Sequence, residues 1–202
     1  MSINLDKGSK IDLRKSITLN ETKENDLSKI TIGLGWDVRK KTGWFSSSDS
    51  DYDLDACALL LENDKLRSNS DIIYYNNKKH NSGKIWSKGD NLTGQGEGDD
   101  EQIVAKLDEL DSKYNKVVFY ATIYQGKSRN QNFSMLENTY IRALNNNDNE
   151  ITKFAISGNS ELKGKCSFIF AEAIRENGTW MFKAIGEGLD TDRVDEVADK
   201  YK

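Results

Sequence analysis

The amino-acid sequence predicts a mainly β protein: a two-sheet β-sandwich of about ten strands with a short C-terminal helix. Short β-branched and aromatic runs recur along the 202 residues, and helical periodicity is scarce. Asn177-Gly178 also stands between two apolar runs, which is the strongest short-range signal for a hairpin. Many short strands at this spacing are typical of a sandwich, and we expect residues 1–202 to form a single domain.

The expected strands are separate apolar segments. Ile30–Leu34 alternates around β-branched residues, and Val117–Tyr124 is almost continuously apolar, as in a strand buried on both faces. Asp71–Tyr75 is a further aromatic and β-branched run. Ser167–Ile174 and Thr179–Ile185 flank the Asn-Gly pair, so we expect them to form a hairpin closed by a type I′ turn.

Turns and helices are expected in few places. Near the start, Asp6–Ser9 resembles a turn between Ile3–Leu5 and Lys10–Leu13. Residues 190–202 are the best helix candidate, since Asp190 or Thr191 can cap it and apolar residues recur on one face. Those apolar residues are Val194, Val197, Ala198 and Tyr201, and short helical turns are also expected over Asp108–Tyr114 and Ser134–Asn138.

Composition excludes several classes of function. The formal net charge is −4 and no basic stripe is visible, which argues against a nucleic-acid partner. The longest apolar run has eight residues, too few to span a bilayer, and Met1–Asp6 lacks the apolar region of a signal peptide. We therefore expect a cytoplasmic protein without a transmembrane segment.

The residues that commonly carry metal or nucleophilic chemistry are rare. Cys57 and Cys166 are far apart and are expected to be reduced and buried. His80 is the single histidine and is expected in a polar loop, which argues against a histidine-based zinc site or a Ser-His-Asp triad. No nucleophile–base pair is evident, so the sequence predicts a protein that is not an enzyme.

The segment Gly89–Glu101 is the most acidic part of the chain. Five carboxylates and two carboxamides fall between Asp90 and Glu101, with three alternating glycines and no Lys or Arg. Two carboxylates ~4 Å apart repel by about 1 kcal/mol even in water, and a hard cation removes that penalty. Oxygen ligands with several carboxylates indicate Ca²⁺ before a transition metal, although a solvated acidic loop remains the alternative. The spacing is not that of an EF-hand, because Leu92 and Gly94 occupy the third and fifth positions.

A second acidic cluster precedes an apolar run. Asp49, Asp51, Asp53 and Asp55 recur at every second residue, so in a strand they share one face at intervals of ~6.5–7 Å. Asp37 follows the expected strand Ile30–Leu34. We hypothesise that Asp37, Asp53 and Asp55 join the acidic loop to hold two Ca²⁺ ions. For Asp49 and Asp51, a solvated face is an equally good interpretation.

These same motifs resemble the TerD family of tellurium resistance and bacterial stress proteins. The resemblance covers nearly the whole chain and is densest in the acidic loop. Two departures are Gln125, where the family usually has an acid, and Cys57, where it usually has serine. The matching segments are Leu5–Gly8, Gly33–Asp37, Tyr52–Cys57, Tyr75–Asn77, Gly89–Glu101, Arg129–Phe133 and Ala184–Gly188.

The resemblance implies a calcium-binding β-sandwich with two ions near one edge. It implies a role in resistance to tellurite and other chemical stress, beside other stress-operon proteins at the membrane surface, and it supplies no catalytic residue. The oxygen ligands that it implies are the side chains of Asp37, Asp53, Asp55, Asp90, Asn91, Glu97, Asp99, Asp100 and Glu101, with the carbonyls of Leu92 and Gly94.

Three hypotheses for function follow. The first is a non-enzymatic Ca²⁺-dependent sensor or scaffold. The second is a module for a cyclic nucleotide or another small ligand, in which Arg129 or Arg142 meets a phosphate. The third is a Ca²⁺-dependent phosphodiester hydrolase, which requires two ions ~3.5–4 Å apart with open coordination positions. The first hypothesis agrees best with the acidic loops.

Overall fold

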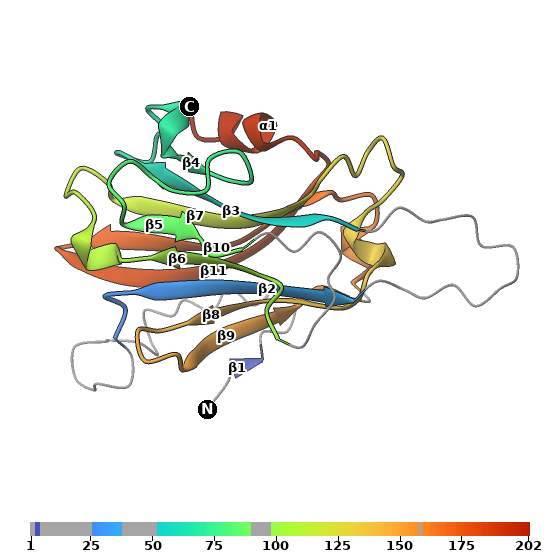
Figure 1. The fold of residues 1–202 in the computed structure, drawn as a ribbon, viewed down its shortest axis with the longest axis horizontal. Helices are drawn as coiled ribbons and strands as arrows, with labels where there is room; N and C mark the ends of the chain where they lie inside the picture. The colour runs from blue at the N-terminus through green and yellow to red at the C-terminus, as the bar shows by residue number, and fades with distance from the viewer. Residues whose placement is uncertain (1–2, 5–25, 38–51, 90–97, 158) are drawn as a thin grey trace, which may run out of the picture.

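The computed structural model describes residues 3–4, 26–37, 52–89, 98–157 and 159–202. Within them, two β-sheets pack face to face, and the protein is mainly β (Figure 1). Every paired strand runs antiparallel to its neighbour except β1, which lies parallel to β9. One sheet has the order β1 (Ile3–Asn4), β9 (Glu150–Ala155), β8 (Glu137–Leu144), β2 (Ile30–Asp37), β6 (Glu101–Ala105), β5 (Ile85–Ser87). The other has the order β11 (Thr179–Leu189), β10 (Ser167–Glu176), β7 (Lys116–Ile123), β3 (Leu54–Leu61), β4 (Ile72–Ile73).

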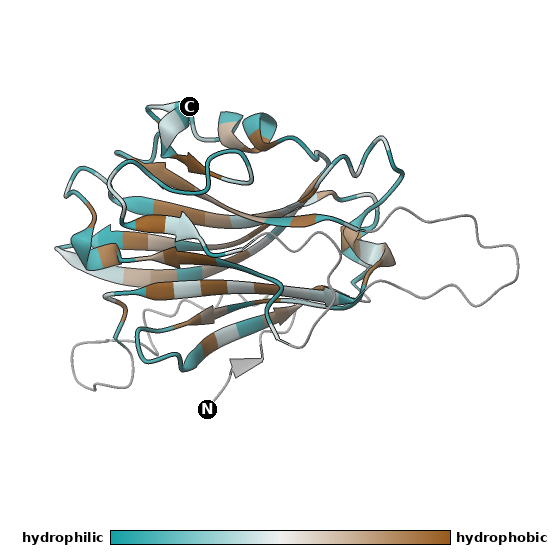
Figure 2. Ribbon diagram, viewed as in Figure 1, coloured by the Kyte–Doolittle hydropathy of each residue, from teal (hydrophilic) through white to brown (hydrophobic). Residues whose placement is uncertain are grey.

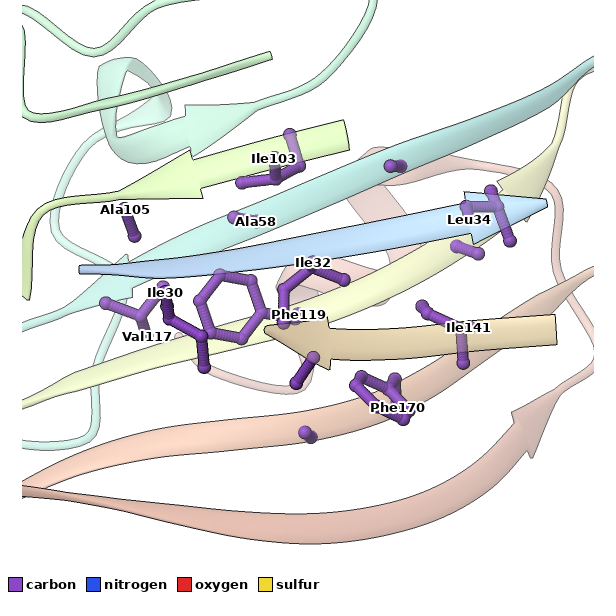
Figure 3. Close-up of a cluster of buried hydrophobic side chains, with 14 of the residues drawn as sticks. Ile30, Ile32, Leu34, Ala58, Ile103, Ala105, Val117, Phe119, Ile141 and Phe170 are labelled. Atoms are coloured by element: carbon purple, nitrogen blue, oxygen red, sulfur yellow. The ribbon is translucent and has the colours of Figure 1, made fainter. Parts of the chain in front are cut away.

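The main core lies between the two sheets. Ile30, Ile32 and Leu34 point from β2 into this space and are at most 1% exposed. Phe119 from β7 and Phe170 from β10 enter it from the opposite sheet (Figure 3). Apolar and polar residues alternate along several strands, as the bands of Figure 2 show. The two-residue period of a strand therefore selects the buried face, as the sequence predicts.

A second apolar cluster covers the outer face of the five-stranded sheet. Cys57, Leu59 and Leu61 point outward from β3, whereas the residues between them point into the main core. The short helix α1 (Val194–Asp199) covers this cluster and contributes Val197 and Ala198 to it. Figure 1 shows α1 above β3 and β4. Burial on both faces explains why the end of β3 carries an uninterrupted apolar run.

The hairpin between β10 and β11 confirms the prediction from Asn177-Gly178. Asn177 has φ 51° and Gly178 has φ 82°. Both residues of a type I′ turn need positive φ, which Asn and Gly adopt at low cost. Strand pairing then continues from Glu176 opposite Thr179 to Ser167 opposite Leu189.

Two expected elements differ in extent. The run Asp71–Tyr75 yields only the two-residue β4, because a 3₁₀ turn over Asn69–Asp71 precedes it and a tight bridge between Tyr74 and Asn77 follows it. The C-terminal helix spans Val194–Asp199 rather than residues 190–202. Thr191 acts just before the helix, since its hydroxyl accepts the Arg193 N–H and donates to Glu196.

The remaining connections contain short 3₁₀ turns. Leu107–Glu109 and Phe133–Met135 each overlap only the first two residues of an expected helical turn, and Ser160–Leu162 is a further 3₁₀ turn. The expected turn at Asp6–Ser9 lies outside the described residues. Both cysteines are free and buried, as predicted. In the described parts of the chain, no helix is long and apolar enough to cross a membrane.

Candidate metal-binding end of the sandwich

Three consecutive acids, Asp99, Asp100 and Glu101, lead into β6 at one end of the sandwich. Because successive side chains of an extended backbone point in different directions, the three carboxylates reach three different places. The other predicted ligands of this loop, Asp90, Asn91, Leu92, Gly94 and Glu97, lie outside the described residues.

Asp99 lies against the outer face of the six-stranded sheet and is held by Arg142 of β8. Its Oδ1 accepts from Arg142 Nε at 2.8 Å and its Oδ2 from Nη2 at 3.1 Å. Gln102 Nε2 donates to Oδ2 at 2.9 Å, and the Tyr140 hydroxyl lies 3.1 Å from Oδ1 and 2.7 Å from the Gly98 carbonyl. The Tyr140 hydroxyl carries one proton and its shorter contact is to Gly98, so Arg142 and Gln102 supply the three full hydrogen bonds to Asp99.

The two glycines of the segment Gly33–Asp37 make room for this cluster. A Cβ built on Gly33 would lie 2.1 Å from Asp99 Oδ2, and one on Gly35 would lie 2.6 Å from the Tyr140 ring. Any side chain at Gly33 would therefore expel the Asp99 carboxylate. The glycines face outward on β2. Leu34, which lies between them, and Trp36, which follows Gly35, are buried in the core.

Asp100 joins the end of β2 by two hydrogen bonds. Its Oδ2 accepts the Trp36 N–H at 2.9 Å, and its own N–H donates to the Leu34 carbonyl at 2.8 Å. The Trp36 indole Nε1 in turn donates to the Tyr52 carbonyl at 3.2 Å. Asp100, the end of β2 and the residues that precede β3 are thereby joined to one another.

Glu101 turns inward and connects the two sheets. It pairs with Leu34 in the six-stranded sheet, and its Oε2 accepts the Ala56 N–H of β3 at 2.5 Å. β4 pairs with β3 only at Ala58 and Leu59, so at Ala56 the edge of β3 is open to a side-chain acceptor. The residue is 4% exposed. A buried carboxylate thus replaces a strand at this end of the sandwich.

Asp55 brings a second buried carboxylate to the same part of β3. It is 3% exposed and points to the outer face of the five-stranded sheet, on the same side as Cys57. Burial raises the pKa of the Cys57 thiol, and the charges of Asp55 and Glu101 raise it further. Both carboxylates therefore lie near Cys57, on either side of the Ala56 backbone.

Asp53 and Asp37 lie nearer the surface. The backbone carbonyl of Asp53 accepts the Tyr124 N–H at 2.8 Å, which ties the approach to β3 to the end of β7. Asp37 is exposed at the end of β2, where its Oδ2 accepts from Asn138 Nδ2 at 2.8 Å. Among the described residues, no three His, Cys, Asp or Glu side chains are arranged to hold a metal ion.

The arrangement of the arginines bears on the small-ligand hypothesis. Arg142 donates to Asp99 and also lies 3.6 Å from a carboxylate oxygen of Glu150, so it would have to leave both to bind a phosphate. Arg129 lies with its guanidinium carbon 5.5 Å from the centre of the Tyr124 ring and donates to Gln125. The geometry does not favour a phosphate at Arg142.

A polar network around His80 was not predicted from the sequence. His80 lies in the loop between β4 and β5, as predicted, but it is only 5% exposed, and its Nε2 lies 3.2 Å from Asp71 Oδ1. The Tyr114 hydroxyl donates to the same oxygen at 2.9 Å. Burial raises the pKa of Tyr114, and its hydrogen bond to Asp71 adds to that rise.

Asp71, His80 and Ser82 form a hydrogen-bonded chain with the composition of a catalytic triad. His80 Nε2 lies 3.2 Å from Asp71 Oδ1, and the Ser82 hydroxyl lies 2.7 Å from His80 Nδ1. The Ser82 N–H also donates to Nδ1 at 3.1 Å, and the Lys84 N–H donates to the Ser82 hydroxyl oxygen at 3.2 Å. Together with the Tyr114 hydroxyl, these contacts join the segment 69–85 to Tyr114.

The chain matches the family described as TerD domain over residues 1–201. It is 40% identical to the tellurium resistance protein TerX of Serratia marcescens, over 95% of each chain, and 38% identical to the stress response protein SCP2 of Bacillus subtilis (strain 168), over 100% of each.

A solved structure shows the same fold. The crystal structure of a homologue of telluride resistance protein (TerD) from Streptomyces coelicolor A3(2) is similar with a TM-score of 0.69 and 22% identity. The match covers 87% of this chain and 98% of that one.

Proposed function

This chain belongs to the TerD family of tellurium resistance and stress proteins, and from that premise we propose that it is a non-catalytic calcium-binding protein that acts as a Ca²⁺-dependent sensor or scaffold. Named relatives include general stress protein 16U of Bacillus subtilis (strain 168), which is 36% identical over 93% of this chain. The proposal places the protein in the cytoplasm, beside other stress-operon proteins at the membrane surface.

One observation carries the calcium proposal: Asp55 and Glu101 bring two buried carboxylates to the same stretch of β3. Both are at most 4% exposed, and both act on the Cys57 thiol. Like charges repel more strongly where water is excluded, because the effective dielectric constant is lower. A divalent cation beside them offsets that repulsion, and the donors are the hard oxygens that Ca²⁺ prefers.

The proposal divides the acids of Asp99–Glu101 by role. Glu101 would supply a ligand from β6, and Asp55 and Asp53 would supply ligands from β3 and its approach, so that a bound cation would join the two strands. Asp99 would instead serve as an anchor, since Arg142 and Gln102 already donate three hydrogen bonds to it. Ca²⁺ takes six to eight oxygens, so the shells would be completed by the loop residues Asp90, Asn91, Leu92, Gly94 and Glu97.

Calcium bound at this end would connect the two sheets. The start of β6 belongs to the six-stranded sheet and the start of β3 to the five-stranded one. A cation that binds only the native fold stabilises it, by about 2.7 kcal/mol at a concentration one hundred times the Kd. The same linkage makes the arrangement of the acidic loop depend on calcium, which is what a sensor or a switchable scaffold requires.

Thermal melts in EGTA and in excess CaCl₂ test the proposal. We expect calcium to raise Tm by about 5–10 °C, from the linkage energy and the usual dependence of Tm on stability in a chain of this length. Glu101→Gln keeps an acceptor for the Ala56 N–H but removes the charge, so it should shrink the rise. Glu109→Gln changes an exposed glutamate beyond the opposite end of β6 and should leave it unchanged. Equal Tm values for the wild type with and without calcium would contradict the proposal.

A further inference from the structure

A pocket of about 480 Å³ opens on the outer face of the five-stranded sheet. Its walls come from the segment around β4, the end of β7 and the turn that leads into α1. The residues that matter for its chemistry are Tyr74, Tyr75, Tyr124, Asp192 and Arg193, and Asp55 lies at its boundary with the metal-binding end. Its volume is within the range of roughly 300–1,000 Å³ that is usual for small-molecule sites.

Three tyrosine rings form one side of this pocket in an edge-to-face series. The ring centres of Tyr74 and Tyr75 are 5.1 Å apart at 80°, and those of Tyr75 and Tyr124 are 5.3 Å apart at 81°. Tyr75 is 36% exposed, one of two large apolar side chains recorded as exposed in the described chain. A tyrosine face carries partial negative charge and attracts cations. The guanidinium of Arg129 beside Tyr124 shows that one of these rings already has a cationic neighbour.

The charged groups of the pocket are mostly acidic. Among the described residues that line the pocket, Arg193 is the one arginine, and its Nε and Nη2 donate to the Asp195 carboxylate at 3.1 Å and 2.5 Å. Asp192 instead accepts a backbone N–H, from Lys127 at 2.9 Å. Because this backbone N–H is uncharged, it does not neutralise the Asp192 carboxylate. Three carboxylates and one guanidinium lie among the described lining residues, so the pocket combines aromatic faces with a net negative charge.

We propose that this pocket binds a small organic cation of the alkylammonium class, such as a free polyamine. An ammonium group would lie over the exposed face of Tyr75 with Asp192 as its counter-charge, and the methylene chain would cover the neighbouring rings. This activity goes beyond the calcium proposal, because tyrosine rings supply no ligand for Ca²⁺. The exposed ion pair of Arg193 and Asp195 would lie at the rim of the pocket.

Calorimetric titration with spermidine, in EGTA and again in CaCl₂, tests this inference. Titration in EGTA makes the result independent of whether calcium binds at all. We expect saturable binding to the wild type, with Tyr75→Ala weakening the affinity about fivefold or more and Tyr75→Phe retaining it, because the phenylalanine ring keeps its face. Asp192→Asn should weaken it similarly while keeping an acceptor for the Lys127 N–H.

The matched control is Asp199→Asn, which removes an aspartate of α1 that is paired with Lys202 and lies outside the pocket. It should leave spermidine affinity unchanged. An equal loss in Asp199→Asn and Asp192→Asn would mean diffuse attraction to an acidic protein and would overturn the proposal. The absence of binding at millimolar spermidine would also overturn the proposal, and so would tighter binding of adenosine monophosphate than of spermidine. Binding of Nα-acetyl-lysine amide as tight as that of spermidine would overturn it too, because it would indicate a protein side chain as the occupant.

Discussion

Two arginine–aspartate pairs meet through the same guanidinium nitrogens, but the aspartate of one pair is buried and that of the other is exposed. Arg142 and Asp99 meet through Nε and Nη2 on the outer face of the six-stranded sheet, and the Asp99 side chain is 1% exposed. Arg193 and Asp195 meet through the same two nitrogens beside α1, where their side chains are 62% and 61% exposed. The difference is burial, not contact distance.

Burial decides what each pair does. Removing one partner of a buried pair leaves an uncompensated charge, which is strongly destabilising. An exposed pair is solvated on both sides and contributes little. The Arg142–Asp99 pair therefore fixes the entrance of β6 and the position of the acids that follow it. The Arg193–Asp195 pair can rearrange freely at the rim of the tyrosine-lined pocket.

Gly33→Ala should have the largest effect on stability. Its Cβ would lie 2.1 Å from Asp99 Oδ2, so the carboxylate must leave Arg142 and Gln102. We expect the free energy of unfolding to fall by about 3–5 kcal/mol, the usual cost of breaking a buried pair. Urea denaturation measures it. Gly89→Ala is the control, because a Cβ there meets nothing within 4 Å. If both substitutions lower the free energy of unfolding by the same amount, the Asp99 carboxylate does not lie against Gly33.

Arg142→Met should come next, with a loss of about 2–3 kcal/mol. The value is below the full cost of a broken buried pair because the Arg142 side chain is 28% exposed. Water that reaches its position can solvate part of the Asp99 charge that the substitution leaves unpaired. Arg193→Met should give no measurable change in the same urea titration. Comparable losses in the two variants would refute the distinction between the pairs.

The titration of Asp195 should give the smallest effect. The hydrogen bonds from Arg193 lower the pKa of Asp195 below its ordinary value of 3.8. Since the folded-state pKa is depressed, the small stabilisation is present above pH 3.8 and is lost as the pH falls through the folded value. NMR should follow this pKa and show it returning toward 3.8 in Arg193→Met. An unchanged pKa in that variant would mean that the pair does not persist in solution.

The sequence predicted the parts of the fold that depend on local pattern. Alternation along β2 and the apolar run of β7 identify strands, and Asn177-Gly178 identifies a hairpin, because each signal is contained within a few residues. The extents of β4 and α1 were predicted less well. Turn residues shorten β4, and the hydrogen bonds of Thr191 hold the residues before Val194 outside the helix.

The composition of the acidic segment singles out these residues as candidate ligands, but it does not show where each side chain points. Asp99, Asp100 and Glu101 read as three equivalent ligands, whereas they contact Arg142, the β2 backbone and β3 respectively. Arg142 is 43 residues from Asp99 and Ala56 is 45 from Glu101, so neither contact follows from neighbouring residues. The burial of His80 was likewise not predicted, because Tyr114, which helps to bury it, is 34 residues away.

The most direct test of the calcium proposal is a calorimetric titration of metal-stripped protein with Ca²⁺. We predict saturable binding of about two ions per chain, with at least one lost in Asp55→Asn and none lost in the control Asp199→Asn. No calcium binding by the wild type, or unchanged binding in Asp55→Asn, would contradict the account of the buried carboxylates around Ala56.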